Sequence, residues 1–477
     1  MAPTPEKASI QRLTEHYRQQ SPHLSKQVRI EQTLRHAATQ LWPAGTRLPP
    51  HRQLAAAFGV ARHTLARAVA SLINDGLLAT AHGRGTWTRQ PAEPVQLPPI
   101  NTQLSRRAKR VLAGPGASLV QTGSFMPGVP DIAQFPMRKW RELYASVTVP
   151  QNTLLLTYST GGYGPLKRAI RDFLLRWRQL DCDTDQIIIT DGAHNGLQLC
   201  AMALTDPGDR VAIESPSYWG ARKIFSAFDL ELDMLPWWPG QGHSLPEHPL
   251  PTQLAYLMGG HHYPLSVPTQ LDEKRRLCQA LNPAYVIEDD YEFGEETHNN
   301  LLYTARSERH ILVGSFSKIM FPGLRLGYLV VPKHLAPSIN RLRSELFREG
   351  RMLDQAVLAR FMFDGHLDHW CQRIHREYLG RQQVVHDILG SLPQVKHISP
   401  PSHAISLCVE FEDGVNDVAL VDALMKEQLV MRPLSIACTP ADQRSGLIMG
   451  VGMLSGETLM HEVKRLKTAL LKLLKNI

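Results

Sequence analysis

The sequence of 477 residues is poor in cysteine and in long apolar runs. Its six cysteines include no C-x-x-C pair, which argues against a disulfide framework or a zinc site and for reduced thiols. No stretch reaches the roughly 18 consecutive apolar residues of a membrane helix, and the N-terminus has no apolar segment typical of a signal peptide. With 43% hydrophobic and 20% charged residues, a disordered or fibrous chain is excluded. We expect a cytoplasmic globular protein without a membrane partner.

Excess positive charge is lacking over most of the chain and is concentrated at one end. The first 118 residues hold 16 Lys and Arg against 5 Asp and Glu, whereas the rest holds 36 against 39. This asymmetry indicates nucleic acid or an anionic membrane as the partner of the N-terminal end. A solvated basic surface is the alternative that charge alone leaves open.

Composition divides the chain into four segments. We expect a flexible polar tail over residues 1–22, a compact domain over 23–89 and a linker over 90–117. The linker mixes proline and glycine with a basic run made of Arg106, Arg107, Lys109 and Arg110. Over 118–477, short β-branched runs alternate with helical stretches, which predicts a parallel α/β sheet. These runs are IIIT (187–190), VAIE (211–214), AYVIED (284–289), ILVGS (311–315) and GYLVV (327–331).

Residues 23–89 have the pattern of a winged helix-turn-helix. One helix is indicated by apolar residues at helical spacing from Ile30 to Leu41, and two short helices over 52–58 and 61–73 flank a turn at Gly59. Two short strands then flank AHGRG (81–85), a hairpin tip. A small helical domain with surface arginines explains each element singly, but the ordered set favours DNA binding. The candidate DNA-contacting residues are Arg52, Arg62, His63, Thr64, Arg67 and Arg84.

The motifs L-P-x-x-R-Q-L-A, F-G-V-x-R-x-T-L, D-G-L-L and G-R-G-T occur in order within residues 25–89. In these motifs the segment resembles the GntR-type winged helix, which implies a double-stranded DNA operator as partner. Ala61 departs from the family, which usually places Ser there. A Ser at this position can cap the recognition helix, an effect worth about 0.5–2 kcal/mol.

Two segments of the C-terminal part predict ligand chemistry at strand ends. In IIITDGAHNGLQLCAMAL (187–204), backbone N–H groups around Ala193 and His194 would hold a phosphate at a helix N-terminus, although an ordinary β–α turn is the alternative. In VIEDDYEFGEE (286–296), Asp289 ends a buried strand, where ligands bind in open α/β sheets. Asp289 could pair with a protonated ring nitrogen and Tyr291 could donate to a phenolate. A helix-capping or metal-binding acid cluster is equally open.

The segment GSFSKIMFPGLRLGYLV (314–330) is the most informative. Lys318 follows a buried strand and precedes an apolar run, and a partly desolvated lysine is nucleophilic enough to form an imine. Ser315, Ser317 and Arg325 suit a phosphate ester. Lys318 alone could be a surface lysine, but an imine lysine, an acid for a ring nitrogen and a phosphate cradle together describe a pyridoxal 5′-phosphate site.

These residues, with Y-x-x-x-x-Y-G (158–164), D-P-G-D-R-V (206–211) and E-S-P-S-Y (214–218), resemble the fold-type I aminotransferases over about 118–477. The resemblance implies an α/β domain with a small C-terminal α+β subdomain, and Lys318 as the attachment point of pyridoxal phosphate. It implies that Tyr218 stacks on the cofactor ring. It also implies that Tyr158 reaches the phosphate of a neighbouring subunit, hence a homodimer. A GntR-type winged helix ahead of such a domain resembles the MocR subfamily of bacterial transcription regulators.

Several positions depart from an aminotransferase. Ile448 stands where an arginine for the substrate carboxylate is expected, and Arg444 nearby is a possible substitute. Trp219 and Gly220 follow Tyr218, where several regulators of this type place an arginine, and Tyr263 replaces an asparagine. His261 and His262 either contact an effector or are solvated loop residues.

We therefore expect a DNA-binding regulator that senses the cofactor itself, or a small amine or amino acid, more than it turns a substrate over. One alternative is a working aminotransferase with an appended DNA-binding domain. The other is a core that has lost its cofactor and serves only for dimerisation.

Overall fold

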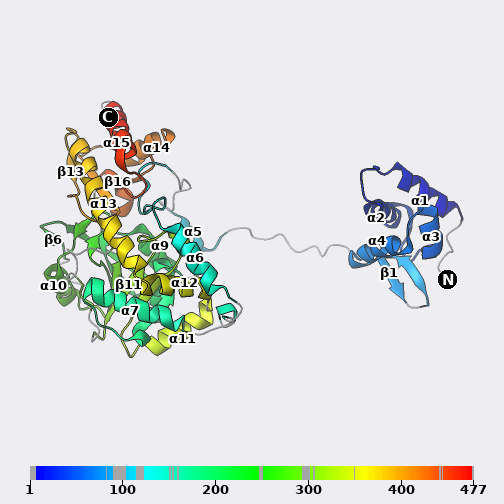
Figure 1. Ribbon diagram of the computed structural model, residues 1–477, viewed down its shortest axis with the longest axis horizontal. Coiled ribbons are helices and arrows are strands. Elements are labelled where there is room, and N and C mark those ends of the chain that lie inside the picture. The colour runs from blue at the N-terminus through cyan, green and yellow to red at the C-terminus, as the bar shows by residue number, and fades with distance from the viewer. Residues whose placement is uncertain are drawn as a thin grey trace. The chain divides into compact units, whose positions relative to one another are not determined.

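The computed structural model describes residues 7–81, 83–89, 104–113, 123–149, 152, 155–157, 161–245, 251–292, 301–303, 307–348, 350–439, 442 and 444–474. The chain divides into two compact units, residues 1–103 and 104–477 (Figure 1). In the described part of the chain, no helix combines the length and the apolar character needed to cross a bilayer.

The first unit is a winged helix-turn-helix. Its helices are α1 (Lys7–Gln19), α2 (Lys26–His36), which continues as the π-helical turn η1 (Ala37–Leu41), α3 (His51–Phe58) and α4 (Arg62–Asn74). An antiparallel hairpin of β1 (Leu78–Ala81) and β2 (Gly85–Thr88) follows. Gly59 has φ 63°, so the chain reverses from α3 into α4 in a conformation that glycine adopts without strain. The helix, turn, helix and hairpin predicted for residues 23–89 are all present.

The prediction of a flexible tail over residues 1–22 is wrong for residues 7–19. They form α1, whose Leu13 and Tyr17 are buried in the core of the unit. The ring of Tyr17 contacts Phe58 at 4.9 Å between centroids, and the Arg29 guanidinium lies 4.3 Å from the Tyr17 centroid. These apolar residues are sparse among polar ones, so their helical spacing is hard to see in the sequence. Residues 1–6 lie outside the described part.

The second unit is built on an eight-stranded sheet. Its strands, in spatial order, are β3 (Ile187–Thr190), β12 (Gly327–Val330), β11 (His310–Ser315), β10 (Tyr285–Asp290), β7 (Leu254–Met258), β4 (Arg210–Ser215), β5 (Glu231–Trp238) and β6 (Gly242–His243). The strands from β11 to β5 are mutually parallel, as predicted. β12 is antiparallel to both neighbours, against the prediction, because residues 316–326 are too few for a helical crossover from β11.

Helices cover both faces of this sheet, so alternate residues of a strand enter different cores. Ile187 and Ile189 pack with α7 (Gly164–Arg178) and α12 (Met352–Phe363). Ile188 packs with α8 (Ala193–Leu204), α9 (Trp219–Ala227) and α11 (Ala336–Phe347). The remaining helices of this part are α6 (Met137–Val147), α10 (Leu271–Leu281) and α13 (His366–Leu389), and β8 (His261–His262) pairs with β9 (Val267–Pro268).

The predicted small α+β subdomain is present at the C-terminal end. An antiparallel sheet in the order β13 (Val395–Ile398), β14 (Ser406–Phe411), β16 (Gly446–Gly450) and β15 (Arg432–Pro433) packs with α14 (Asp417–Lys426) and α15 (Gly456–Leu473). β15 is adjacent to β16, and this pairing brings one side chain into the candidate site described below.

The prediction of a linker over 90–117 is wrong for residues 104–113. Here α5 (Arg106–Leu112) forms, with Ser105 as its N-cap. Arg107 and Arg110 both pair with Asp229, and Lys223 Nζ donates to the Val111 carbonyl at 2.6 Å, so α5 belongs to the second unit. The composition of the segment could not predict this, because the arginines pair with an aspartate more than a hundred residues later in the chain. Residues 90–103 and 114–117 lie outside the described part.

Candidate functional site: a cavity at the carboxyl edge of the sheet

A cavity of about 220 Å³ lies at the carboxyl ends of β7, β10 and β11 and the start of α8. This is the edge at which open α/β sheets bind ligands. Nine of the ten predicted cofactor residues line it, namely Ala193, His194, Tyr218, Asp289, Tyr291, Ser315, Ser317, Lys318 and Arg325. The tenth, Tyr158, lies outside the described residues.

Lys318 lies in the turn that follows β11, and its Nζ donates to the Gly128 carbonyl at 3.0 Å. Burial lowers the pKa of its ammonium, which raises the fraction of neutral, nucleophilic amine. Gly128 has φ 68°, which favours glycine, and a Cβ there would lie 2.3 Å from Nζ, so a larger residue would displace the Lys318 amine. The sequence analysis missed Gly128, whose only signal is the turn-rich segment M-P-G-V-P (126–130).

Asp289 is the carboxylate of β10 that faces the cavity. Its Oδ2 accepts a hydrogen bond from Tyr256 at 2.6 Å, and burial raises its pKa to about 6. The next residue, Asp290, points to the other face of the sheet, where it receives two buried N–H bonds from Arg178 at 2.7 and 2.8 Å. Because successive side chains of a strand point to opposite faces of the sheet, these two adjacent acids contact different groups.

The acid-cluster alternative for this segment finds no support in the described residues. Asp290 is committed to Arg178, and Glu292 Oε1 accepts from the Ile405 amide at 2.9 Å. Within the described ranges no group of three or more His, Cys, Asp or Glu is placed to hold a metal ion. Glu295 and Glu296 lie outside the described part.

One end of the cavity has the groups that a phosphate ester needs. α8 begins at Ala193 without a side-chain cap, so its first N–H groups and the positive end of its dipole are available. Arg325, in the left-handed region at φ 50°, places its Cζ 3.7 Å from the position of a Cβ on Gly192. The Ser317 hydroxyl is buried without a hydrogen-bond partner, whereas Ser315 Oγ accepts from the Ser317 amide at 3.2 Å.

A buried hydroxyl without a partner is unfavourable unless a ligand satisfies it. The helix terminus, the guanidinium and the Ser317 hydroxyl together therefore fit the phosphate of pyridoxal phosphate. Asp289 and Lys318 fit its ring nitrogen and its aldehyde. The hydrogen-bonding and charged groups that line this cavity thus match the functional groups of pyridoxal phosphate.

Aromatic side chains line the cavity beside Asp289, Lys318 and the phosphate-binding groups. Tyr218 and His194 share a hydrogen bond of 2.5 Å between OH and Nε2, and burial lowers the pKa of His194. The ring of Tyr218 meets Tyr263 edge-on at 5.7 Å, and Tyr263 meets Tyr291 at 6.2 Å. A Cβ on Gly220 would lie 2.7 Å from His194 Nε2, which explains why glycine follows Trp219.

Ile448 stands where an arginine was expected, and a different arginine, on the neighbouring strand, lines the cavity. Arg432 on β15 is the register partner of Ile448 on β16, and its guanidinium lines the cavity above the Trp219 ring at 5.5 Å. Ile448 itself is buried in an apolar cluster. The sequence analysis did not select Arg432, because only strand pairing brings it to the cavity.

Arg444 does not take this role. Its guanidinium pairs with Asp442 at 3.0 Å, stacks on Trp238 and donates to the Trp237 carbonyl, and it is absent from the cavity lining.

His261 and His262 are neither solvated nor part of the cavity lining. Both are buried in β8, and the His262 ring stacks on Trp237 at 4.0 Å. The interpretation as solvated loop residues is wrong, and a direct effector contact is not supported by their position.

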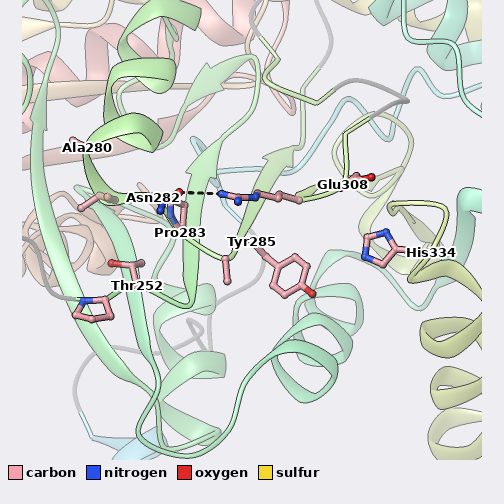
Figure 2. Close-up of a pocket in the computed structure, with 11 residues that line it drawn as sticks. Thr252, Ala280, Asn282, Pro283, Tyr285, Glu308 and His334 are labelled. Atoms are coloured by element: carbon pink, nitrogen blue, oxygen red, sulfur yellow. Dashed lines mark hydrogen bonds between the residues drawn. The ribbon is translucent and has the colours of Figure 1, made fainter.

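A larger hollow, of about 750 Å³, lies at the opposite edge of the sheet, beside the first residues of β7 and β10. Figure 2 shows Thr252, Asn282 and Tyr285 around it, with a hydrogen bond of 3.0 Å from Arg309 to Asn282. None of the predicted cofactor residues lines this hollow. The concentration of reactive groups, and not the volume, identifies the smaller cavity as the candidate site.

In the first unit, the predicted DNA-contacting residues lie on α3, α4 and the hairpin. Arg52 is on α3; Arg62, His63, Thr64 and Arg67 are in the first turns of α4; Arg84 is at the hairpin tip. All are exposed except Thr64, which is half-buried. Ala61 is the N-cap of α4 and provides no side-chain hydrogen bond, as its departure from Ser implies.

Comparison with known proteins agrees with this division. Residues 26–87 match the family "Bacterial regulatory proteins, gntR family", and residues 130–245 and 283–447 match "Aminotransferase class I and II". The chain is 29% identical over 446 residues to the probable rhizopine catabolism regulatory protein MocR of Rhizobium meliloti, with 90% of each chain covered. It is 29% identical to the pyridoxine biosynthesis transcriptional regulator PdxR of Corynebacterium glutamicum, covering 90% of this chain and 92% of that one.

Among solved structures, the chain is similar to LysN, the alpha-aminoadipate aminotransferase of Thermus thermophilus, in complex with N-(5′-phosphopyridoxyl)-L-leucine. The TM-score is 0.67 at 23% identity, with 78% of this chain and 98% of that chain covered, which supports the fold. The chain therefore belongs to the class I and II aminotransferase family, and ahead of that domain it carries a gntR-family helix-turn-helix domain, the arrangement of the MocR subfamily.

Proposed function

We propose that the chain is a bacterial cytoplasmic transcription regulator whose second unit binds pyridoxal phosphate through Lys318 and senses it, or a small amine or amino acid. The observation that carries this proposal is the convergence of nine predicted residues on one cavity in a chain that begins with a helix-turn-helix. The names of MocR and PdxR as regulatory proteins support it.

When bound, pyridoxal phosphate supplies an aldehyde that condenses with primary amines. In this proposal Lys318 Nζ is the attachment point, and the carboxylate of Asp289 pairs with the ring nitrogen. The start of α8, Ser317 and Arg325 hold the phosphate, and Tyr218 packs on the ring. Tyr291 donates a hydrogen bond to the ring oxygen.

Arg432 indicates which effectors suit the cavity. A guanidinium binds a carboxylate through two parallel N–H bonds, a charge-assisted contact stronger than a neutral hydrogen bond. Arg432 lies in the same lining as Lys318, so a molecule with a primary amine and a carboxylate could engage both. We therefore favour an amino acid over a simple amine as the effector.

On the DNA side, α4 would enter the major groove and the hairpin would contact the backbone. A homodimer built on the second unit, with Tyr158 reaching the partner's phosphate site, would present two such units to two half-sites. Effector binding changes operator affinity only if the effector prefers one of the two domain arrangements.

An absorbance titration of the purified chain with pyridoxal phosphate, with and without candidate amino acids, tests the sensing site. The proposal expects a saturable visible band that shifts on addition of the effector. It expects no such band in Lys318→Ala, while DNA binding by that variant persists. A wild-type protein that stays colourless would instead support the alternative in which the second unit has lost its cofactor and serves only for dimerisation.

An active aminotransferase is the second candidate, because Lys318 and Arg432 line one cavity and thus retain an amine and a carboxylate contact. A stopped-flow search for half-reactions over a panel of amino acids separates the two. Fast half-reactions with many turnovers favour the enzyme; saturable binding without turnover favours the sensor.

A further inference from the structure

A short segment, residues 45–48, pairs with the hairpin of the helix-turn-helix unit through an isolated bridge. Backbone bonds join residues 45–48 to β2, from Gly45 N to Thr88 O and from Leu48 N to Thr86 O, both at 2.8 Å, and from Thr88 N to Thr46 O at 2.9 Å. Arg47 is the bridge partner of Trp87 in this antiparallel pairing. The backbone of Arg47 is therefore fixed to the hairpin, although it lies almost 40 residues before it in the chain.

The side chain of Arg47 lies against the tip of the hairpin. A Cβ built on Gly85 would be 3.0 Å from Arg47 Nε and 3.2 Å from Nη2. Gly85 has φ +87°, a conformation that other residues rarely adopt, and its missing side chain leaves the space that the guanidinium occupies. Arg84, the predicted hairpin contact, is the residue before Gly85, so two arginines lie at one tip.

The guanidinium of Arg47 carries a charge that no described acidic residue of the unit neutralises. Its side chain is exposed, and among the described residues no acidic group forms an ion pair with it. Arg35, by contrast, pairs with Asp75. An exposed guanidinium without an internal partner, held by a paired backbone, is pre-organised to meet an external anion.

We infer that Arg47 contacts a phosphate of the double-stranded DNA backbone and forms, with Arg84, a two-arginine clamp at the hairpin. The inference rests on the proposed DNA-binding function and adds a residue that lies outside the helix-turn-helix and the hairpin loop. A phosphate contact fixes the register of the protein on the duplex without reading bases, so it contributes equally to binding of any sequence.

The test uses the full-length chain and a fluorescein-labelled 30-base-pair duplex of random sequence, with affinity followed by fluorescence anisotropy between about 50 and 200 mM KCl. Each phosphate contact adds about 0.9 to the slope of log affinity against log salt. Arg47→Ala is expected to lower that slope by about one. It is also expected to weaken binding up to about 5-fold, the range of an exposed ion pair. The double variant with Arg84→Ala is expected to lower the slope by about two.

Arg47→Lys retains the charge and is expected to retain the slope. Arg12→Ala removes an equally exposed arginine from α1 and is expected to leave the slope unchanged, which controls for the loss of net charge. If Arg47→Ala unfolds the unit, seen by circular dichroism, Arg47→Gln gives the same test with a longer neutral side chain. A wild-type slope in a folded neutral variant overturns the clamp and leaves the DNA-binding function intact. A wild-type chain that binds no duplex overturns that function itself.

Discussion

The buried carboxylate of Asp289 makes the stability of the fold depend on pH. Its folded-state pKa of about 6 lies above the ordinary value of 3.8, because the carboxylate is desolvated. The folded state thus binds a proton more tightly than the unfolded state does between about pH 4 and pH 6. Stability from this group is present below pH 4 and is lost as the pH rises through 6, by roughly 3 kcal/mol.

Asp289→Asn is therefore expected to raise the melting temperature of the cofactor-free protein at pH 7.5, with little change at pH 4, while lowering its affinity for pyridoxal phosphate. Differential scanning calorimetry at the two pH values, with a cofactor titration, measures both effects. Asp290→Asn is the matched control with the opposite sign, because it removes the carboxylate that pairs with the buried Arg178, a loss of about 3–5 kcal/mol. A destabilised Asp289→Asn at pH 7.5 would show that this carboxylate stabilises the empty fold.

In the proposed function, Arg432 distinguishes amino acids from simple amines by binding their carboxylate. Arg432→Gln is expected to weaken amino-acid binding at least about 10-fold, since a charged hydrogen bond contributes about 1.5–3 kcal/mol. Binding of an alkylamine without a carboxylate should remain unchanged. The spectral titration described above measures both ligands. Arg444→Gln serves as the control, because Arg444 is engaged by Asp442 and Trp238 away from the cavity. Equal losses for both ligands in Arg432→Gln would assign that arginine a structural role.

The helix α4 lacks a side-chain hydrogen bond at its N-cap. Ala61 has the extended backbone of an N-cap, φ −68° and ψ 147°, but no side-chain oxygen for the first-turn amides. Ala61→Ser is expected to stabilise the helix by about 0.5–2 kcal/mol. Slower hydrogen exchange in residues 61–65 of the full chain would register it. Ala66→Ser places the same side chain on the exposed face of α4, where it cannot act as an N-cap. This control should not slow hydrogen exchange. Equal exchange in Ala61→Ser and wild type would contradict the capping argument.

The elements differ in how far the sequence predicts them. The strands and turns that carry Asp289, Lys318 and Arg325 were predicted because their chemistry and their hydrophobic pattern lie in one short segment each. Arg432 and Gly128 were not predicted, because each reaches the cavity only through pairing or packing with a distant segment. Helix α1 was not predicted for a different reason, because its few apolar residues are spread among polar ones. The prediction of a parallel sheet was wrong for β12, which is antiparallel to both neighbours because the connection from β11 is short.

At the scale of the whole molecule, α5 is the first described helix of the second unit. Its contacts are mostly polar, since Arg107 and Arg110 pair with Asp229 and no side chain of α5 is buried. Asp229→Asn is expected to loosen the helix, because it removes two ion pairs worth about 0.2–1 kcal/mol each from a helix without a fully buried side chain. Asparagine also tolerates the φ of 61° at this position.

Limited trypsin digestion at the arginines of α5, followed by mass spectrometry, measures this loosening. The variant should be cut several-fold faster than wild type, and wild type should approach it in 0.5 M salt. Asp272→Asn, whose carboxylate pairs with Arg275 on its own helix, is the control and should be cut like wild type. Unchanged cleavage in Asp229→Asn would show that the ion pairs do not hold α5.

The central claim is that Lys318 attaches pyridoxal phosphate in this DNA-binding chain. Incubation with the cofactor, reduction with borohydride and peptide mass analysis test it most directly. We predict one adduct per chain, located on the peptide with Lys318, absent from Lys318→Ala and unchanged in Lys333→Ala, where an exposed lysine is removed. No adduct in the wild-type chain, or an adduct on another lysine, would contradict the account.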